Sequence, residues 1–143
     1  KISYECGSSA DAVSCSVADI LQLPVRSEEF DVLVCFGVFQ HLSDIGPSVR
    51  EFYRALRPAG FCYINTLNKR FLLAGRKPML VTYDNREVAR HCTSVGFDIV
   101  SNTPLLLFPR FLRVLERLET IRDIHPLLWP LAHDLTIVAR KPE

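Results

Sequence analysis

The chain has 143 residues, a formal net charge of +1, and 48% hydrophobic residues. This length is typical of one domain, and the composition favours a packed core over a disordered segment. The near-neutral charge gives no reason to expect nucleic-acid binding, and no apolar run reaches the roughly 20 residues that cross a bilayer. The sequence begins at Lys1 rather than Met and shows no signal peptide, so we expect a fragment of a larger cytoplasmic protein.

The cysteines give the same indication about compartment. Their spacing is irregular, no C-x-x-C pair occurs, and no His stands at metal-ligand spacing, so we expect no metal site. Free buried thiols in a reducing compartment are the simplest interpretation. The five are Cys6, Cys15, Cys35, Cys62 and Cys92.

The first third of the chain predicts two strands. Residues 13–18 form a short β-prone run that ends at Asp19, and a loop with a proline follows over 20–29. Residues 30–36 are almost continuously apolar. Such a run is typical of a strand that is buried on both faces of a parallel sheet.

A helix is predicted after the second strand. Ser43 or Asp44 can cap its start, its apolar residues recur at helical spacing over about 46–56, and Pro58 and Gly60 are expected to end it.

The rest of the chain continues the alternation. Strands are predicted over 61–67, 97–100 and 135–139. A helix that Asp84 can cap is predicted over 82–96, and an amphipathic helix over 110–123. Strands that alternate with helices predict one α/β domain with a mostly parallel sheet.

Five short motifs stand in a fixed order along the chain. They are Asp19-x-x-x-Leu23-Pro24, Phe30-Asp31, Gln40-His41-Leu42, Arg57-Pro58-Ala59-Gly60 and Ala139-Arg140-Lys141-Pro142. From about residue 13 to the end they resemble a class I S-adenosylmethionine-dependent methyltransferase of the small-molecule, type 11-like branch. The resemblance implies a Rossmann-like sheet with an antiparallel last strand, S-adenosylmethionine as the cofactor and a small-molecule acceptor.

The resemblance also implies a cofactor site. In the family, the acid of the Asp-x-x-x-Leu-Pro motif accepts a hydrogen bond from adenine and the next N–H donates to the ring, which puts Asp19 and Ile20 at the adenine. A solvated acid at a strand end is the alternative for Asp19. The end of the following strand lines one wall of the cleft, where a glycine permits close approach of a ligand. This wall corresponds to Cys35, Phe36, Gly37 and Val38, with core packing as the alternative for Phe36.

Candidate acceptor residues follow these motifs. Histidine can take up a proton near neutral pH, so His41, beside Gln40, is a candidate general base, with a structural role in the following loop as the alternative. Asn65 and Thr66 end the next predicted strand and can orient an acceptor or simply form a turn.

Two segments bear on partners. The stretch over 68–77 is basic, and we expect it to form a solvated loop. The alternatives are that it binds an anionic substrate or makes a peripheral contact with a membrane surface. The stretch over 104–133 is apolar, and one expectation is that it forms a lid over an apolar or lipid-like acceptor. The alternatives are that it packs on the sheet or on a partner subunit.

The family's glycine-rich loop is absent, because no G-x-G occurs in the sequence. We therefore expect the sheet to be incomplete at its N-terminal side and this segment alone to bind S-adenosylmethionine weakly or not at all. Two other functions remain open at this point. One is a non-catalytic methyltransferase-like subunit or interaction module, and the other is a nucleotide-binding protein such as a dehydrogenase.

Overall fold

The computed structural model describes residues 3–6, 13–69, 80–105, 132 and 134–143. The expected helix over 110–123 and nearly all of the expected lid over 104–133 lie outside these residues, as does most of the basic stretch.

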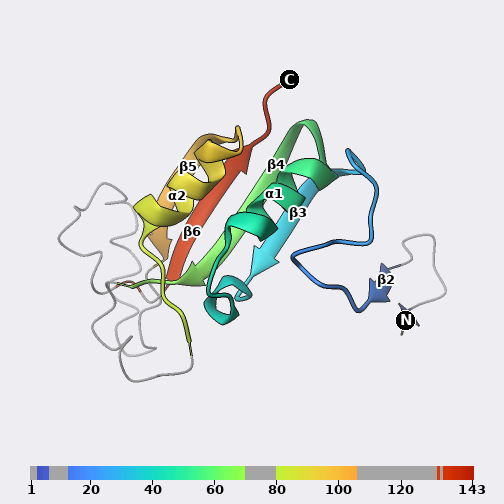
Figure 1. The fold of residues 1–143 in the computed structure, drawn as a ribbon, viewed down its shortest axis with the longest axis horizontal. Helices are drawn as coiled ribbons and strands as arrows, with labels where there is room; N and C mark the ends of the chain where they lie inside the picture. The colour runs from blue at the N-terminus through green and yellow to red at the C-terminus, as the bar shows by residue number, and fades with distance from the viewer. Residues whose placement is uncertain (1–2, 7–12, 70–79, 106–131, 133) are drawn as a thin grey trace, which may run out of the picture.

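Four strands form the main sheet, which Figure 1 shows face on. They are β3 (Phe30–Phe36), β4 (Leu56–Leu67), β5 (Asp98–Leu105) and β6 (Asp134–Arg140), in the order β3-β4-β6-β5. β3 runs parallel to β4, whereas β6 lies antiparallel between β4 and β5. The expected α/β sheet with an antiparallel last strand is therefore confirmed.

Two further strands form a separate small sheet. β1 (Ser3–Cys6) pairs antiparallel with β2 (Val13–Ser16). The predicted strand over 13–18 thus exists and ends at Ser16. It does not join the main sheet among the described residues, because its hydrogen-bond partner is β1.

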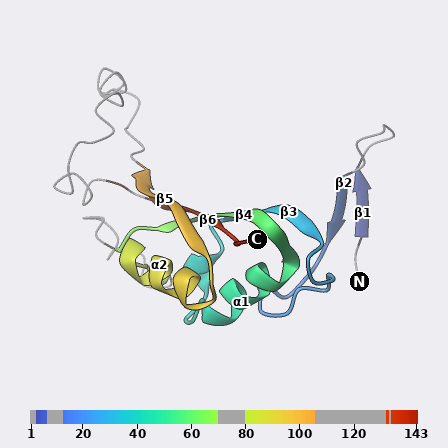
Figure 2. The ribbon, with the colours of Figure 1, turned by 90° about the horizontal axis from the view of Figure 1, so that it is seen from above.

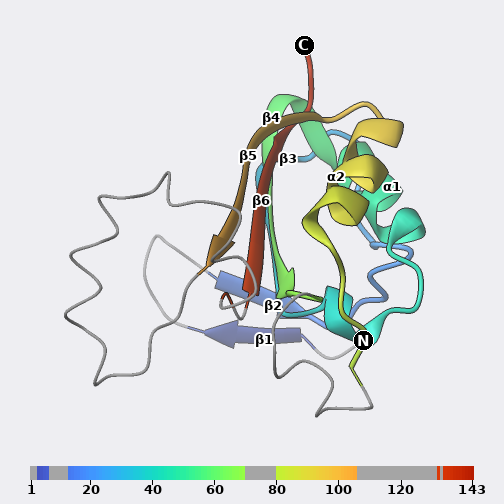
Figure 3. The same cartoon turned by 90° about the vertical axis from the view of Figure 1, so that its left-hand side faces the viewer.

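Both described helices lie on the same side of the main sheet (Figures 2 and 3). α1 (Gly46–Ala55) and α2 (Asn85–Ser94) bury their apolar stripes there, and the short 3-10 helix η1 (Phe39–His41) adds Phe39 to the core. Such burial is worth about 25 cal/mol per Å² of apolar surface removed from water. The centre of this core is made of Phe39, Ile45, Val49, Phe52, Leu56, Cys62, Ile64, Val88, Cys92 and Ile137.

Both bounds of α1 agree with the helix predicted over about 46–56, but the residues expected to end it do not end it. Asp44 accepts the Gly46 N–H at 2.8 Å, although Ile45 occupies the N-cap position. The helix ends at Ala55 because the next residue, Leu56, is already extended and begins β4. Pro58 therefore lies inside a strand that starts five residues before the predicted one, and it does not end the helix.

α2 starts as predicted. The Asp84 carboxylate accepts the Arg86 N–H at 2.9 Å, and Glu87 lies in the first turn. Gly96 adopts a φ of +107° just after the helix, where glycine is favoured.

The prediction that β3 is buried on both faces is wrong. Cys35 faces α1 and α2 and is 4% exposed, whereas the alternate residues Val34 and Phe36 are 64% and 65% exposed. The reason is that the described helices cover one face only. We call the side of the main sheet away from α1 and α2 the open face; β3 is also an edge strand of this sheet.

Candidate functional site

The carboxyl ends of β3 and β4 lie at one edge of the sheet, and Gly37 joins them. Its N–H donates to the carbonyl oxygen of Asn65 at 3.1 Å, and its φ is +65°. A Cβ placed on Gly37 would meet no atom within 4 Å. The backbone at the end of β3 is therefore held in place, with open space beside Gly37.

The neighbours of Gly37 differ in what they offer. The Cys35 side chain lies in the core, where burial raises the pKa of the thiol to about 11 against a smaller opposing effect of a hydrogen bond with the Val38 backbone. Only the backbone of Cys35 can therefore meet a ligand. Val38 packs half-buried against the core, while the Phe36 ring lies on the open face.

Asp19 forms a local turn. Its Oδ1 accepts the Leu21 N–H at 2.9 Å, and its carbonyl oxygen accepts the Gln22 N–H at 3.1 Å. The carboxylate is exposed, and within the described part of the chain its Oδ2 keeps no partner, so it can accept a hydrogen bond from a ligand. The side chain of Ile20 packs against the core and anchors the turn.

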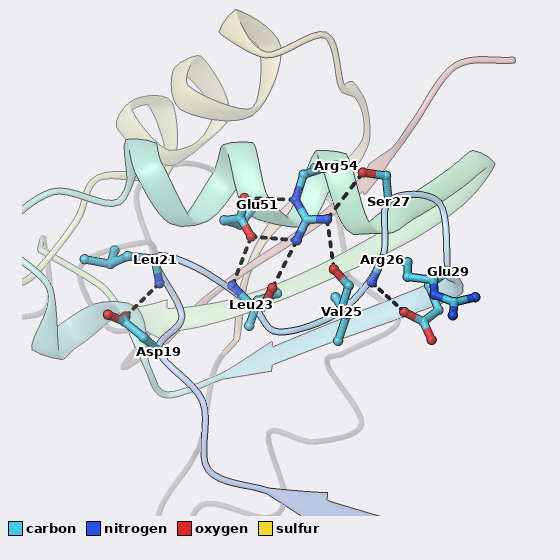
Figure 4. A network of polar contacts seen from close by, with 9 residues as sticks. All are labelled: Asp19, Leu21, Leu23, Val25, Arg26, Ser27, Glu29, Glu51 and Arg54. Carbon is cyan, nitrogen blue, oxygen red and sulfur yellow. Dashed lines mark hydrogen bonds and ion pairs between the residues drawn. The ribbon is translucent and has the colours of Figure 1, made fainter. Parts of the chain in front are cut away.

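Arg54 on α1 holds the loop that follows Asp19 (Figure 4). Its guanidinium donates to the carbonyl oxygens of Leu23 at 3.1 Å and Val25 at 2.9 Å, and it pairs with Glu51 at 2.8 Å. Glu51 in turn accepts the Leu23 N–H at 3.0 Å. The hydrogen bond from Arg54 lowers the pKa of the Glu51 carboxyl.

This Arg54 network was not predicted. The sequence showed Glu51 and Arg54 three residues apart on one helix, a spacing at which side chains meet. It could not show that the Leu23-Pro24 loop crosses the same helix. The network explains physically why the loop after Asp19 keeps a fixed path.

Gln40 and His41 lie in η1, just beyond Gly37. The Gln40 carbonyl oxygen accepts the Val81 N–H at 2.8 Å, which ties η1 to the segment that leads into α2. The His41 ring is exposed, with its Nε2 3.4 Å from the Gln40 Nε2. Its exposure leaves the ring accessible to an acceptor molecule.

The structure separates Asn65 from Thr66. They are consecutive residues of β4, so their side chains point to opposite faces of the sheet. Asn65 is in register with Phe36 and lies on the open face, while Thr66 lies on the face covered by the helices. Both are buried, and among the described residues neither the Asn65 Nδ2 nor the Thr66 Oγ1 has a hydrogen-bond partner.

Parts of the chain are similar to known proteins. Residues 3–64 match the family described as "Methyltransferase domain". A probable S-adenosylmethionine-dependent methyltransferase of Mycobacterium tuberculosis is 34% identical over 82 residues, which cover 57% of this chain and 30% of that protein. The ubiquinone biosynthesis O-methyltransferase of Thiobacillus denitrificans is 29% identical over 141 residues, covering 87% of this chain and 59% of that protein.

A solved structure shows the same fold. The S-adenosylmethionine-dependent methyltransferase of Archaeoglobus fulgidus superposes with a TM-score of 0.67 at 14% identity, over 87% of this chain and 66% of that one. The present chain thus spans from about a third to two thirds of the lengths of these proteins. No helix in the described part of the chain is long and apolar enough to span a membrane.

The strand order, with an antiparallel strand inserted beside parallel ones, and the superposition on this solved structure define a Rossmann-like α/β fold. The matched region and the sequence relatives show that the chain is similar to S-adenosylmethionine-dependent methyltransferases.

Proposed function

We propose that this chain provides the adenine-binding end and the acceptor side of an enzyme that transfers a methyl group from S-adenosylmethionine to a small molecule. The observation that carries the proposal is the open, fixed backbone at Gly37, tied to Asn65 at the carboxyl edge of the sheet. Ligands of open α/β sheets bind at this edge.

The residues present fit the cofactor. Asp19 Oδ2 is an unused acceptor for the adenine amine, and the Ile20 N–H is the expected donor to the ring. The backbone from Phe36 to Val38 forms the wall beside it, with space at Gly37 for close contact. When bound, the cofactor supplies an electrophilic methyl group on a sulfonium.

The acceptor side has a candidate base. His41 is exposed one short turn beyond Gly37, and a histidine can take the proton that an attacking hydroxyl or amine loses. Gln40, whose backbone is fixed by Val81, holds the turn that carries His41. Most of the rate enhancement in this scheme comes from alignment of the acceptor with the methyl group.

A titration of the ¹⁵N-labelled chain with S-adenosylhomocysteine, followed by NMR, tests the cofactor site. Because the glycine-rich loop is absent from this sequence, we expect weak binding that still shifts the backbone amides of Ile20, Gly37 and Val38. Asp19→Ala should abolish the shift at Ile20. The control Asp31→Ala, which removes an exposed strand-end acid paired with Arg57, should preserve it. Saturating nucleoside without shifts at these amides would refute the proposed site.

A further inference from the structure

The backbone around Asp19 is held to the rest of the protein by the loop that follows it. β2, which ends three residues before Asp19, pairs with β1 and has no strand partner in the main sheet among the described residues. The turn at Asp19 is closed by the Gln22 N–H, and the next residue, Leu23, is bonded to α1 at both its N–H and its carbonyl oxygen. The place of the Asp19 carboxylate therefore depends on the side chains that hold Leu23, together with the packing of Ile20 on the core.

Arg54 uses its whole guanidinium to hold this loop (Figure 4). Its Nε and Nη2 donate to the two carboxylate oxygens of Glu51 at 3.0 and 2.8 Å. Nη2 also donates to the Leu23 carbonyl oxygen at 3.1 Å, while Nη1 donates to the Val25 carbonyl oxygen at 2.9 Å and to the Ser27 hydroxyl at 3.3 Å. Every N–H of the side chain thus has an acceptor, in a rigid planar arrangement that a lysine cannot reproduce.

Glu51 completes the Arg54 network. Its Oε2 accepts the Leu23 N–H at 3.0 Å as well as the bond from Arg54. The side chains of Arg54 and Glu51 are 33% and 18% exposed, which favours these bonds over those of a fully exposed ion pair. The backbone N–H groups of residues 28 and 29 continue the contact, because they donate to carbonyl oxygens at the end of α1 at 2.8 and 2.9 Å. The loop is therefore fixed along the last turns of this helix.

This support matters for Asp19 because its exposed carboxylate is the part that a ligand can reach. The bond from the Leu21 N–H to Oδ1, at 2.9 Å, orients the carboxylate within its own turn. That bond does not set the position of the turn relative to Gly37 and the main sheet. The Arg54 network does, because α1 packs on the same sheet. A displacement of about 1 Å is enough to break a hydrogen bond between an acceptor and an amine.

We infer that Arg54 and Glu51 are positioning residues for the adenine end of the cofactor site, because they fix the loop that places Asp19 against the exocyclic amine of adenine. This inference rests on the proposed function, in which Asp19 accepts from that amine. It adds that recognition of the amine depends on two side chains of α1 that act through the loop and not by contact with the cofactor.

Binding of adenosine and of purine riboside to the 143-residue chain tests the inference, because the two nucleosides differ only by the exocyclic amine. With affinities taken from the NMR shift of the Gly37 amide, the wild type should bind adenosine about 5-fold more tightly than purine riboside. Asp19→Ala should bind the two equally. Arg54→Lys keeps the charge and loses the fork of donors, so its preference for adenosine should fall below about 2-fold.

The preference separates positioning from stability. If Arg54 only stabilised the fold, Arg54→Lys would change both affinities by the same factor and would leave their ratio unchanged. Glu51→Gln keeps the size of the side chain but not its charge, and it should reduce the preference in the same way. This second variant keeps the inference testable if Arg54→Lys does not fold.

Arg57→Lys is the matched control. Arg57 also forms two bonds with one carboxylate, that of Asp31, at 2.9 and 2.8 Å, but this pair is exposed and joins β4 to β3. Arg57→Lys should therefore keep the wild-type preference for adenosine. A full preference in folded Arg54→Lys or in Glu51→Gln would overturn the inference, as would an equal loss of preference in Arg57→Lys.

The proposed function fails in a different way. A wild type that binds neither nucleoside, or binds both with equal affinity, would refute the adenine site itself, and the inference with it. A wild type that prefers adenosine, with Asp19→Ala without preference and Arg54→Lys unchanged, would support the adenine site and exclude the positioning role.

Discussion

The ammonium group of Lys141 donates to the carbonyl oxygen of Leu56 at 2.8 Å and so caps the end of α1. It also donates to the Tyr53 carbonyl oxygen at 3.1 Å and lies 4.7 Å from the centre of the Tyr53 ring. Lys141 is 8% exposed. A cation at the carboxyl end of a helix is favourable because the last carbonyl groups have no partners within the helix. The closing Ala-Arg-Lys-Pro motif therefore has a structural role.

Lys141→Met should lower the free energy of unfolding by about 2 kcal/mol, since it removes charged hydrogen bonds to buried carbonyl groups and retains the apolar stem. Urea unfolding monitored by circular dichroism measures this change. Glu28→Gln is the matched control, because Glu28 contacts the same ammonium only at 3.4 Å and is largely exposed. It should change the free energy by less than about 0.5 kcal/mol. Equal effects of the two variants would mean that the ion pair, and not the cap, matters.

Ala59→Gly should stabilise the protein by about 0.5–1 kcal/mol. Ala59 has a φ of +64°, a left-handed conformation that costs a residue with a Cβ about 1–2 kcal/mol, part of which glycine's flexibility offsets. The adjacent Gly60→Ala should do the opposite, because its Cβ would lie 2.8 Å from the Arg57 carbonyl oxygen. Thermal unfolding of both variants checks the signs, and a destabilised Ala59→Gly variant would disprove the strain.

Glu51→Gln should remove a pH-dependent part of the stability. Arg54 lowers the pKa of the folded Glu51 carboxyl below its ordinary value of 4.5, so the carboxylate stabilises the fold above that pH. This contribution is lost as the pH falls through the lower, folded pKa. The gap in urea midpoint between wild type and variant should therefore be largest near about pH 7 and should narrow as the pH falls below 4.5.

The exposed Glu143 offers a control for that experiment. Its carboxylate lies 3.6 Å from the Arg140 guanidinium at the surface. Glu143→Gln should therefore leave the urea midpoint close to that of the wild type over the same pH range. A constant gap between wild type and Glu51→Gln at every pH would show that Glu51 contributes through packing and not through its charge.

The three buried thiols should resist alkylation in the folded protein. Burial raises the pKa of Cys35 to about 11 and of Cys92 to about 12, and raises that of Cys62 further. At about pH 8, N-ethylmaleimide should modify these three roughly 100-fold more slowly than in urea, because thiolate and access are both lacking. Peptide mass spectrometry reads each site separately. Rapid native labelling of Cys35 would show that its side chain, and not only its backbone, borders the candidate cofactor site.

The sequence predicted the order of the main elements because local patterns determine them. The apolar run over 30–36 matches β3 in both bounds, and Asp84 caps α2 as expected. The alternative of core packing that was left open for Phe36 is wrong, since its side chain is exposed. A continuous apolar run cannot show whether a second layer covers it, which is why the burial of Val34 was predicted wrongly.

Tertiary relationships were beyond the sequence patterns. The contact of Lys141 with Leu56 joins residues 85 positions apart, and that of Arg54 with Leu23 joins residues 31 apart. The register of Asn65 with Thr136 depends on where β6 enters the sheet. Asn65 and Thr66 were therefore grouped as acceptor residues, although a strand directs consecutive side chains to opposite faces.

The position of β6 has a consequence for synthesis of the protein. β6 is the last of the described strands, yet it lies between β4 and β5, and among the described residues β5 has no other strand partner. While a ribosome is still making residues 134–140, β5 lacks its described partner, and β3 and β4 are the described strands of the main sheet that can already pair. A nascent chain must therefore wait for this late strand, and premature termination a few codons early would leave β5 undocked.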